Sequence, residues 1–314
     1  MKKNVLLSLV LGLIVSATAC SPDNETSQTP NVTVTKMVAT NYNTTVSPYT
    51  PNDSTTFNLD SQERIVNSER RFAANSSVAT TNYTYSNGKI SQLEGTVNGV
   101  INSRTYYNYT ANDLTEYRVE SISNTGMTTN INKHTFHTVQ DTIYSDWERS
   151  TNGGTSYSTI LNSKMVIENG DRTFYESYDP INLQWKRVRI TFDANHNPLT
   201  QTESLLINGV WTVTQVDNYT YATLKSPFYK AMEATFGRNT LSRIYHLVPG
   251  AINAVYARNI APHCIDTYTT TWGGAGSVLF QISNTAFSPE YAKRSVINCT
   301  SGPITTSLGY NYYF

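Results

Sequence analysis

From Phe57 onward the chain alternates apolar and polar residues with a period of two, which is typical of strands that bury one face. The alternation is clearest where tyrosines stand two residues apart, as in Tyr83 with Tyr85 and Tyr107 with Tyr109. Successive side chains of a strand point to opposite faces, so the two rings of each pair lie on one face. The pattern predicts a series of strands.

Asn-Gly pairs punctuate this alternating region. This dipeptide accepts the positive φ angles of type I′ turns and is the strongest short signal of a β-hairpin. The five pairs are Asn87-Gly88, Asn98-Gly99, Asn152-Gly153, Asn169-Gly170 and Asn208-Gly209. Five such turns are hard to place in a helical protein, and they predict an antiparallel meander of hairpin repeats over residues 55–225.

The alternating pattern of apolar and polar residues ends near residue 226. Ser226 supplies a capping hydroxyl and Pro227 suits the first helical position, while Gly237 ends the run. Between them, the apolar residues with helical spacing are Phe228, Ala231, Met232 and Phe236. A second short helix is expected from Asn239 toward Pro249, so the helical insertion is predicted to span 226–248.

The C-terminal part returns to the strand pattern, with strands expected at 264–272, 277–283, 291–298 and 304–313. The last strand, rich in tyrosine, is expected to close the sheet. The predicted fold is therefore mainly β: an antiparallel meander forming a large twisted or rolled sheet, with one or two short helices near 226–248. A single domain is expected over 53–314, and the sequence leaves open whether the sheet is open or closed.

The N-terminus has the order of a secretory signal. Lys2 and Lys3 precede an apolar run over 5–15, and small residues lead up to Cys20. The apolar run is shorter than the roughly 20 residues that a membrane-spanning helix needs. We therefore predict a signal peptide over 1–19 that takes no part in the fold.

The residues before the cysteine, Ala17-Thr18-Ala19, resemble the lipobox of bacterial lipoproteins, with alanine in place of the usual leucine. The resemblance implies that Cys20 receives a diacylglycerol and becomes an acylated (palmitate-bearing) N-terminus. Several acyl chains give stable anchoring, whereas one chain holds only marginally. The alternative is an ordinary secreted protein with a chance cysteine at its cleavage site.

The residue after Cys20 is Ser21 rather than aspartate. In such lipoproteins this implies release to the outer membrane. The acidic tract over 21–25 resembles the surface-export tether of Bacteroidota lipoproteins and favours the cell surface over the periplasmic face. Residues 20–52, rich in Thr, Asn, Ser and Pro, are expected to form a lipidated flexible stalk.

Composition narrows the class of function. The chain has 23 basic and 23 acidic residues among 314, so no basic field favours nucleic acid as a partner. Charged residues make up only 15%, and 22 tyrosines are present. A chain poor in charge and rich in Thr, Tyr, Asn and Ser is typical of an extracellular β protein.

If Cys20 is lipidated, Cys264 and Cys299 remain as an even pair in an oxidising compartment, where a disulfide is the default. Such a bond would contribute roughly 3 to 4 kcal/mol on the chain-entropy estimate. Two buried free thiols are the alternative. His263 adjoins Cys264, but neighbours on a strand face opposite sides, so the adjacency does not make a catalytic pair.

The recurring unit of alternating residues, a turn and an aliphatic residue resembles the YD-like hairpin repeats of uncharacterised Bacteroidota surface lipoproteins. The resemblance covers 55–225, and the phrase Ser226-Pro227-Phe228-Tyr229 after the repeats is similar to one found in the same proteins. It implies a β architecture and a lipoprotein context, and it transfers no catalytic residue.

Two motifs suggest metal ligands at first sight. His134 and His137 have a spacing that chelates a metal on a helix, but in a strand they face opposite sides. Asp193, Asn195 and Asn197 resemble the start of a calcium loop, yet the glycine expected next is Pro198. A hairpin turn is favoured for this segment, and neither a metal nor a cofactor is expected.

The sequence contains little that points to a hydrolase. Paired carboxylates could be drawn from a group consisting of Asp146, Glu148, Asp171, Glu176 and Asp179, but their separation in space is not encoded in the sequence. Neither a Gly-x-Ser-x-Gly elbow nor a phosphate-binding loop occurs. We therefore expect the protein not to be an enzyme.

The aromatic residues allow two interpretations. Trp147, Trp185, Trp211 and Trp272, with the tyrosines, could form a platform on which sugars stack, but alternating tyrosines usually cover a core. Core packing is favoured. Separately, Ser54 and Thr142 fit the pattern that is O-glycosylated in exported Bacteroidota proteins.

The sequence alone favours a non-enzymatic outer-membrane or surface-exposed lipoprotein, lipid-anchored, whose β domain is a binding or structural module. Its expected partners are the membrane, through the N-terminal lipid, and an unidentified glycan or surface protein. One rival is a glycan-binding or glycan-active protein. Another is a carrier in which the curved sheet and the 226–248 helices enclose an apolar ligand.

Overall fold

The computed structural model of the protein describes residues 33–43, 50–244, 260–273, 276–286, 292–299 and 307–313. One compact unit comprises Val34–Phe314. The signal peptide, Cys20 and the end of the predicted helical insertion (245–248) lie outside the described residues. Within them are eighteen strands, all in one sheet, and two helices.

The first nine strands are β1 (Lys36–Asn43), β2 (Thr50–Leu59), β3 (Ile65–Phe72), β4 (Val78–Ser86), β5 (Lys89–Val97), β6 (Val100–Thr110), β7 (Asp113–Ile122), β8 (Thr128–Val139) and β9 (Thr142–Ser150). The others are β10 (Ser158–Glu168), β11 (Asp171–Asp179), β12 (Gln184–Phe192), β13 (Pro198–Ile207), β14 (Val210–Lys225), β15 (His263–Trp272), β16 (Gly276–Ala286), β17 (Ala292–Cys299) and β18 (Ser307–Tyr313). The helices are α1 (Pro227–Phe236) and α2 (Arg238–Ile244).

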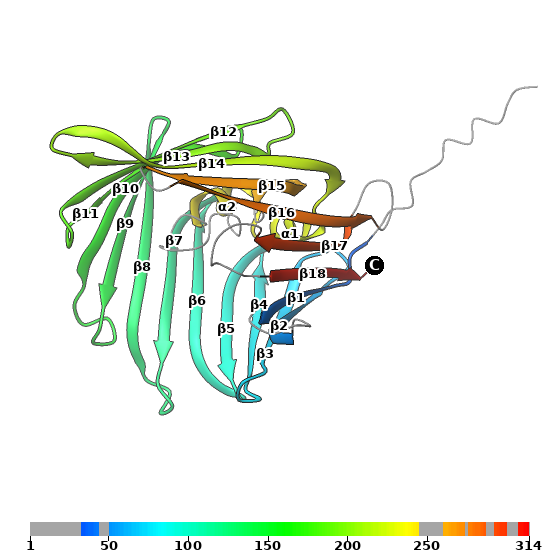
Figure 1. Ribbon diagram of the computed structural model, residues 1–314. Helices are drawn as coiled ribbons and strands as arrows, with labels where there is room; N and C mark the ends of the chain where they lie inside the picture. Colours follow the sequence, from blue (N-terminus) through cyan, green and yellow to red (C-terminus); the bar gives the residue numbers. More distant parts are fainter. Residues whose placement is uncertain are drawn as a thin grey trace, which may run out of the picture. The chain divides into compact units, whose positions relative to one another are not determined.

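The strands form an antiparallel meander, as the sequence predicts (Figure 1). Each strand pairs with the one before and the one after it, and β18 pairs with β1. Met37 of β1 is opposite Phe57 on one side and Tyr312 on the other. The pairing therefore runs around the whole set of strands and closes the sheet, with the last strand in the closing position that its sequence predicts.

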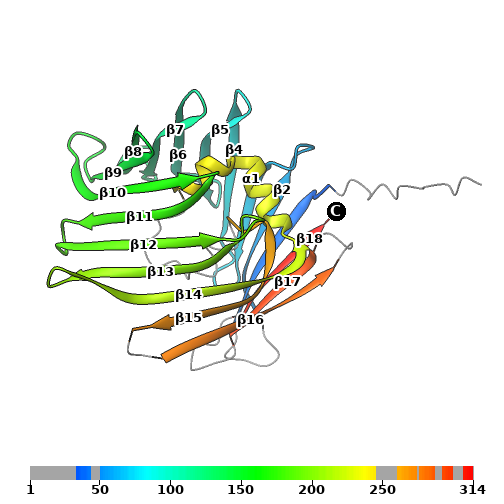
Figure 2. The same ribbon diagram turned by 90° about the horizontal axis from the view of Figure 1, so that it is seen from above.

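The two halves of the sheet differ in direction. Strands β4 to β9 run crosswise to β11 to β14, as the two perpendicular views show (Figures 1 and 2). Such crossing follows from the right-handed twist that every strand adds to its neighbour. The face that carries the helices between these halves is called the inner face below, and the opposite face is the outer face.

Four of the five Asn-Gly pairs make the predicted two-residue turns. In the β5–β6 turn, Asn98 and Gly99 have φ angles of 49° and 80°. The pairs at 87–88, 169–170 and 208–209 have the same combination of positive angles. Asn152 differs, because it lies in the longer β9–β10 loop and its side chain accepts the backbone N–H of Ser156.

The helix signals are confirmed in detail. Ser226 caps α1, and its Oγ accepts the backbone N–H of Tyr229 at 3.2 Å. Pro227 is the first helical residue, and Gly237, with a φ of 73°, ends the helix. The predicted second helix is present as α2, which begins directly afterwards at Arg238.

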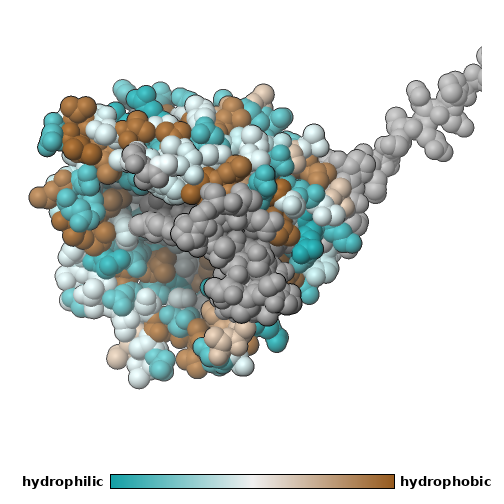
Figure 3. All heavy atoms as spheres, viewed as in Figure 1, coloured by the Kyte–Doolittle hydropathy of each residue, from teal (hydrophilic) through white to brown (hydrophobic). Residues whose placement is uncertain are grey.

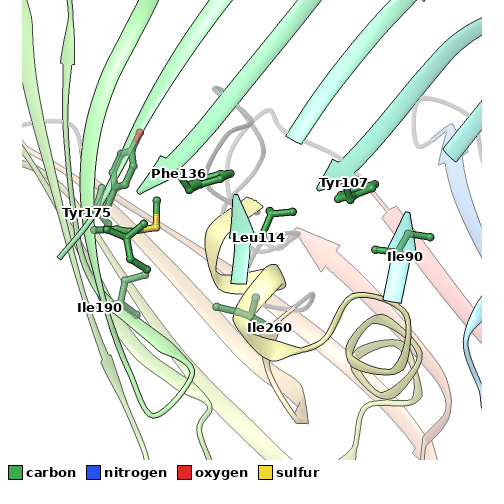
Figure 4. Close-up of a cluster of buried hydrophobic side chains, with 10 residues drawn as sticks. Ile90, Tyr107, Leu114, Phe136, Tyr175, Ile190 and Ile260 are labelled. Carbon is green, nitrogen blue, oxygen red and sulfur yellow. The ribbon is translucent and has the colours of Figure 1, made fainter. Parts of the chain in front are cut away.

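The apolar core lies between the helices and the inner face of the sheet. One cluster joins Phe228, Met232 and Leu241 of the helices to Met37 and Ile65 of the strands. A second cluster contains residues from β5 to β12 and Ile260, seven of which are labelled in Figure 4: Ile90, Tyr107, Leu114, Phe136, Tyr175, Ile190 and Ile260. The helices thus fill the apolar part of the inner face.

The outer face is polar and charged. Residues next to inner-face residues point outward because strands alternate, and several of them form ion pairs between neighbouring strands. These pairs are Arg104–Glu94, Lys133–Glu148, Lys164–Glu176 and Arg187–Glu176, with N–O distances from 2.6 to 3.0 Å. Exposed pairs contribute little to stability, but their presence shows that this part of the outer face suits water.

The predicted stalk is too long. Residues 36–43 and 50–52, expected to be flexible, belong to β1 and β2. Met37 is fully buried, and β1 is hydrogen-bonded on both sides. The sequence does not predict β1 and the start of β2, because these segments are polar and lack a clear alternating pattern. They are held in place by pairing with segments that are distant in the sequence. Among the described residues, no helix has the length and apolar character needed to cross a membrane.

Candidate binding surface on the inner face

A row of aromatic rings crosses four neighbouring strands of the inner face. Tyr107 of β6, Tyr117 of β7, His134 of β8 and Trp147 of β9 are in register. Consecutive ring centroids are 5.3, 5.5 and 5.2 Å apart, and His134 stacks on Trp147. Phe236 of α1 lies 5.9 Å from Tyr107, so the row begins at the apolar core and leads away from it.

Two polar atoms in this row have no hydrogen bond within the described part of the chain: Nδ1 of His134 and Nε1 of Trp147. His134 is only 3% exposed, and burial lowers its pKa to about 4, so the imidazole is neutral at physiological pH. A buried polar atom without a partner is costly, so the aromatic row carries an energetic cost at these two atoms.

The inner face becomes polar beyond Trp147. Arg149, two residues further along β9, lies over the Trp147 ring at 5.6 Å and donates to Oδ1 of Asn132 at 2.9 Å. The inner face next to Trp147 therefore combines an aromatic ring with amide and guanidinium groups. Asp53 and Arg70 form an ion pair at 2.7 Å on a separate part of the sheet, on β2 and β3.

A second polar group lies on the other half of the sheet, around the buried carboxylate of Asp217 on β14. Its oxygens accept hydrogen bonds from Gln215 at 2.9 Å, Gln201 at 3.3 Å and the hydroxyl of Tyr268 at 3.1 Å. Asp217 is 1% exposed, so these neutral donors replace water around it. The sequence analysis did not identify this network, because its members come from three strands.

Nearby inner-face residues are more accessible. Lys186 of β12 and Glu203 of β13 form an ion pair, and Trp272 at the end of β15 is 36% exposed. Trp272 is opposite Gln215 in the sheet and therefore shares its face. The Asp217 network is thus bordered by an exposed indole and by a charged pair.

The four tryptophans do not form one platform. Trp147 and Trp272 lie on the inner face, whereas Trp185 and Trp211 lie on the outer face. The guanidinium of Arg187 covers one face of the Trp211 ring at 3.9 Å. Most tyrosines of the Tyr-x-Tyr pairs pack in or against the core, as the favoured interpretation predicts.

The geometry of the strands and turns shows how the residues of the two metal motifs are placed. His134 faces inward, and His137 lies on the other face, where it stacks on Tyr144 at 5.2 Å. In the β12–β13 turn, Oδ1 of Asp193 accepts the backbone N–H groups of Asn195 and Asn197, both at 2.8 Å. The segment is therefore a turn, as favoured. Within the described ranges, no three His, Cys, Asp or Glu residues are placed to hold a metal ion.

The candidate carboxylates of a hydrolase are not brought together. Glu148 pairs with Lys133, and Glu176 bridges Lys164 and Arg187, all on the outer face. Asp179 closes the β11–β12 turn, where it accepts the backbone N–H of Ile181 at 2.8 Å.

Asp171 belongs to a cluster that the sequence did not reveal. Its carboxylate binds Nδ1 of His196 at 2.7 Å and the guanidinium of Arg238. Arg238 also donates to the hydroxyl of Tyr229 at 2.5 Å. Because Arg238 begins α2 and His196 lies in the β12–β13 turn, the cluster attaches the helices to the sheet.

The predicted disulfide between Cys264 and Cys299 is absent: Cys264 is a free, buried cysteine. Its thiol donates to the carbonyl of Lys225 at 3.4 Å, and burial raises its pKa to about 12. Cys299 is opposite Phe280, which is opposite Tyr268, four residues along β15 from Cys264. That offset is about 13 Å at ~3.3 Å per residue, whereas a disulfide needs Cα atoms within about 7 Å.

The remaining predicted sites concern modification. Ser54 lies within β2 and Thr142 is the first residue of β9, and both are half-buried. Their glycosylation stays a prediction, as does the lipidation of Cys20.

No protein-family model matches the chain, and no curated protein matches it. Among solved structures, the chain is similar to a porin-like protein from Bacteroides uniformis, with 11% identity, a TM-score of 0.41, and 89% of this chain and 96% of the other covered. It is also similar to a porin-like protein from Bacteroides vulgatus, with 10% identity, a TM-score of 0.42, and coverage of 90% and 99%. Likeness at this level carries no argument about function.

Proposed function

We propose that this protein is a non-enzymatic, lipid-anchored protein of the bacterial outer membrane or cell surface that binds a polar, glycan-like ligand on the inner face of its sheet. The observation that carries the binding role is the combination of aromatic rings and polar groups on that face, around Trp147 and Trp272. Sugars present both apolar C–H faces for stacking and hydroxyls for hydrogen bonds, and this surface offers partners for both.

The anchoring part of the proposal rests on the sequence that ends at Cys20. The charged outer face of the sheet supports it, because ion pairs such as Lys133–Glu148 suit water rather than lipid hydrocarbon. A chain with such an outer face reaches a membrane most simply through an N-terminal lipid.

The aromatic row supports a ligand-binding role through the ring of Trp147, which is only partly buried and has Arg149 beside it. Nδ1 of His134 and Nε1 of Trp147 are themselves buried, so a ligand on this surface does not reach them.

The rival role of an apolar-ligand carrier has less support. The apolar part of the inner face is already covered by α1 and α2, whose Phe228, Met232 and Leu241 pack against it. What extends beyond the helices is mainly polar, including Arg149 and the Lys186–Glu203 pair. The exposed inner surface is therefore better matched to a polar ligand.

A glycan array followed by calorimetric titration tests the binding role. We expect the purified protein to bind a subset of polysaccharides, and Trp147→Phe and Trp272→Ala to weaken binding at least tenfold, which is about 1.4 kcal/mol. The matched control is Trp185→Ala, which removes an exposed indole from the outer face and should leave the affinity unchanged. Thermal unfolding of each variant checks that the sheet is intact.

Two results would count against this role. A protein that binds nothing on the array would remove the glycan ligand, and an equal loss of affinity in Trp185→Ala would move the site off the inner face. Release of reducing sugar from a bound polysaccharide would show an enzyme instead of a binding protein.

A further inference from the structure

Two neighbouring hairpins, β11–β12 and β13–β14, end in exposed apolar side chains. We define the tip patch as Ile181, Leu183, Trp185, Ile207, Val210 and Val213, all exposed large hydrophobic residues. The two hairpins are adjacent because β12 pairs with β13, and both turns lie at the same end of these strands (Figures 1 and 2). Hydrophobic residues gather at this end in the space-filling view (Figure 3).

The β11–β12 turn holds its two apolar residues outward. Ile181 and Leu183 are 71% and 74% exposed, the highest values among the described large hydrophobic residues. Asp179 fixes the turn, because its Oδ1 accepts the N–H groups of Ile181 at 2.8 Å and Asn182 at 3.1 Å. The turn is therefore a defined structure rather than a loose loop.

Leu183 also has an unusual backbone conformation. Its φ angle is 50°, in the left-handed region that glycine and asparagine favour and that leucine rarely adopts. A leucine that is both strained and exposed gains nothing from the fold at this position. Its presence is better explained by a contact outside the chain.

The residues behind the tip are ordered by polarity along β12. Trp185, Arg187 and Arg189 alternate with inward residues, so all three point outward at successive steps of about 6.8 Å from the turn. The order from the tip is aliphatic, then indole, then guanidinium. The same order is found across the boundary of a bilayer, where hydrocarbon gives way to an interface rich in tryptophan and then to headgroups.

Charged groups of both signs lie behind the tip, with a small excess of basic groups. On the outer face of β10 to β12, Lys164, Arg187 and Arg189 are accompanied by the carboxylate of Glu176, which pairs with Lys164 and Arg187. Asp179 at the turn adds a second carboxylate, so three basic groups face two acidic groups and the local charge is weakly positive. Such a charge is complementary to anionic phospholipid headgroups.

From this order of side chains we infer that the tip patch inserts shallowly into the surface of a membrane that contains anionic phospholipid. The aliphatic side chains enter the edge of the hydrocarbon, Trp185 lies at the interface, and the arginines contact phosphates. This contact is separate from ligand binding on the inner face and from acylation of Cys20. It gives the anchored protein a second, reversible attachment that orients the sheet on the membrane.

The test uses the full chain with Cys20→Ser, so that no acyl group contributes, and vesicles of phosphatidylethanolamine and phosphatidylglycerol at about 3:1. We expect Ile181→Ser with Leu183→Ser to reduce the partition coefficient at least tenfold in co-sedimentation. The matched control is Val97→Ser with Val100→Ser, which changes two exposed valines on the β5–β6 turn and should have no effect.

Depth is measured by tryptophan quenching with lipids brominated near the headgroup. Quenching on vesicle binding should be lost in Trp185→Phe and retained in Trp272→Phe, because Trp272 has a similar exposure but lies on the inner face. Three results would overturn the inference: equal effects of the two double variants, no quenching of Trp185, or a dimer that Ile181→Ser with Leu183→Ser dissociates while vesicle binding is unchanged. The last result would assign the tip patch to a second copy of the chain.

Discussion

At the scale of single residues, His134 shows how burial controls a titratable group. The imidazole lies between Tyr117 and Trp147, with ring centroids 5.5 and 5.2 Å away. Desolvation disfavours its charged form and lowers its pKa from the usual 6.5 to about 4. Protonation is therefore coupled to unfolding, because the unfolded chain binds this proton more readily than the folded chain.

The sign of the pH dependence follows from this shift. Because the folded pKa lies below the unfolded pKa, the stabilisation is complete above pH ~6.5 and is lost as the pH falls toward 4. Between pH 7 and 5, His134 should lower the free energy of unfolding by about 2 kcal/mol. Urea denaturation at several pH values measures this slope, and His134→Phe should remove it.

The matched control is His137→Phe, which replaces the outward-facing histidine of the same strand and should leave the slope unchanged. If His134→Phe kept the full slope between pH 7 and 5, the loss of stability would have to come from another group.

At the scale of elements, one hydroxyl joins α1 to the sheet. Thr235 is 2% exposed, and its Oγ1 donates to the carbonyl of Ala231 at 2.7 Å. The same oxygen accepts the backbone N–H of Ile65, the first residue of β3, at 2.9 Å. The helix thereby satisfies a buried backbone donor of a strand 170 positions away in the sequence.

Replacing Thr235 with valine keeps the shape of the side chain and removes this hydrogen bond. We expect Thr235→Val to reduce the free energy of unfolding by about 1–3 kcal/mol, because the N–H of Ile65 is left buried without a partner. Equilibrium urea unfolding measures the difference. Thr235→Ser retains the hydroxyl and should be closer to the original protein; equal losses in both variants would assign the effect to packing.

At the scale of the whole molecule, β1 is the element that closes the sheet, because it pairs with both β2 and β18. Cys20 precedes β1 in the sequence and therefore belongs to no strand of the closed sheet. Acylation and folding should therefore be separable properties of this protein.

Cys20→Ser tests that separation. The variant should lose palmitate labelling and should no longer remain in the membrane fraction after a high-salt wash, while its far-UV circular dichroism stays that of a β protein. The wash removes the weaker, reversible contact proposed for the tip patch. A variant that stayed in the washed membrane fraction would contradict lipid anchoring through Cys20.

Much of the fold could be predicted because its signals are local. The Asn98-Gly99 turn depends on the φ angles that two residues accept, and α1 depends on the cap at Ser226 and the stop at Gly237. Strand β1 could not be predicted in the same way. Its neighbours lie at opposite ends of the chain, and Met37 takes its place in the sheet only when β2 and β18 both pair with β1.

The candidate binding surface was harder to predict because β-bulges reverse the faces of a strand. Trp211 and Asp217 stand an even number of residues apart on β14 and should share a face. A register shift opposite Glu203 and Ser204 inserts Thr214, so Trp211 points outward and Asp217 inward. Local alternation cannot reveal such a shift, because it is set by the partner strand.

The sequence by itself determined the mainly β class of the fold: hairpins with Asn-Gly turns, a capped helix and strands that alternate. Each depends on interactions among neighbouring residues. Only the tertiary structure decided that the sheet closes through β1, that Cys264 stays a free thiol, and which tryptophans face inward. These features depend on which distant strands pair and in what register, and pairing energy is shared between segments that are far apart in the sequence.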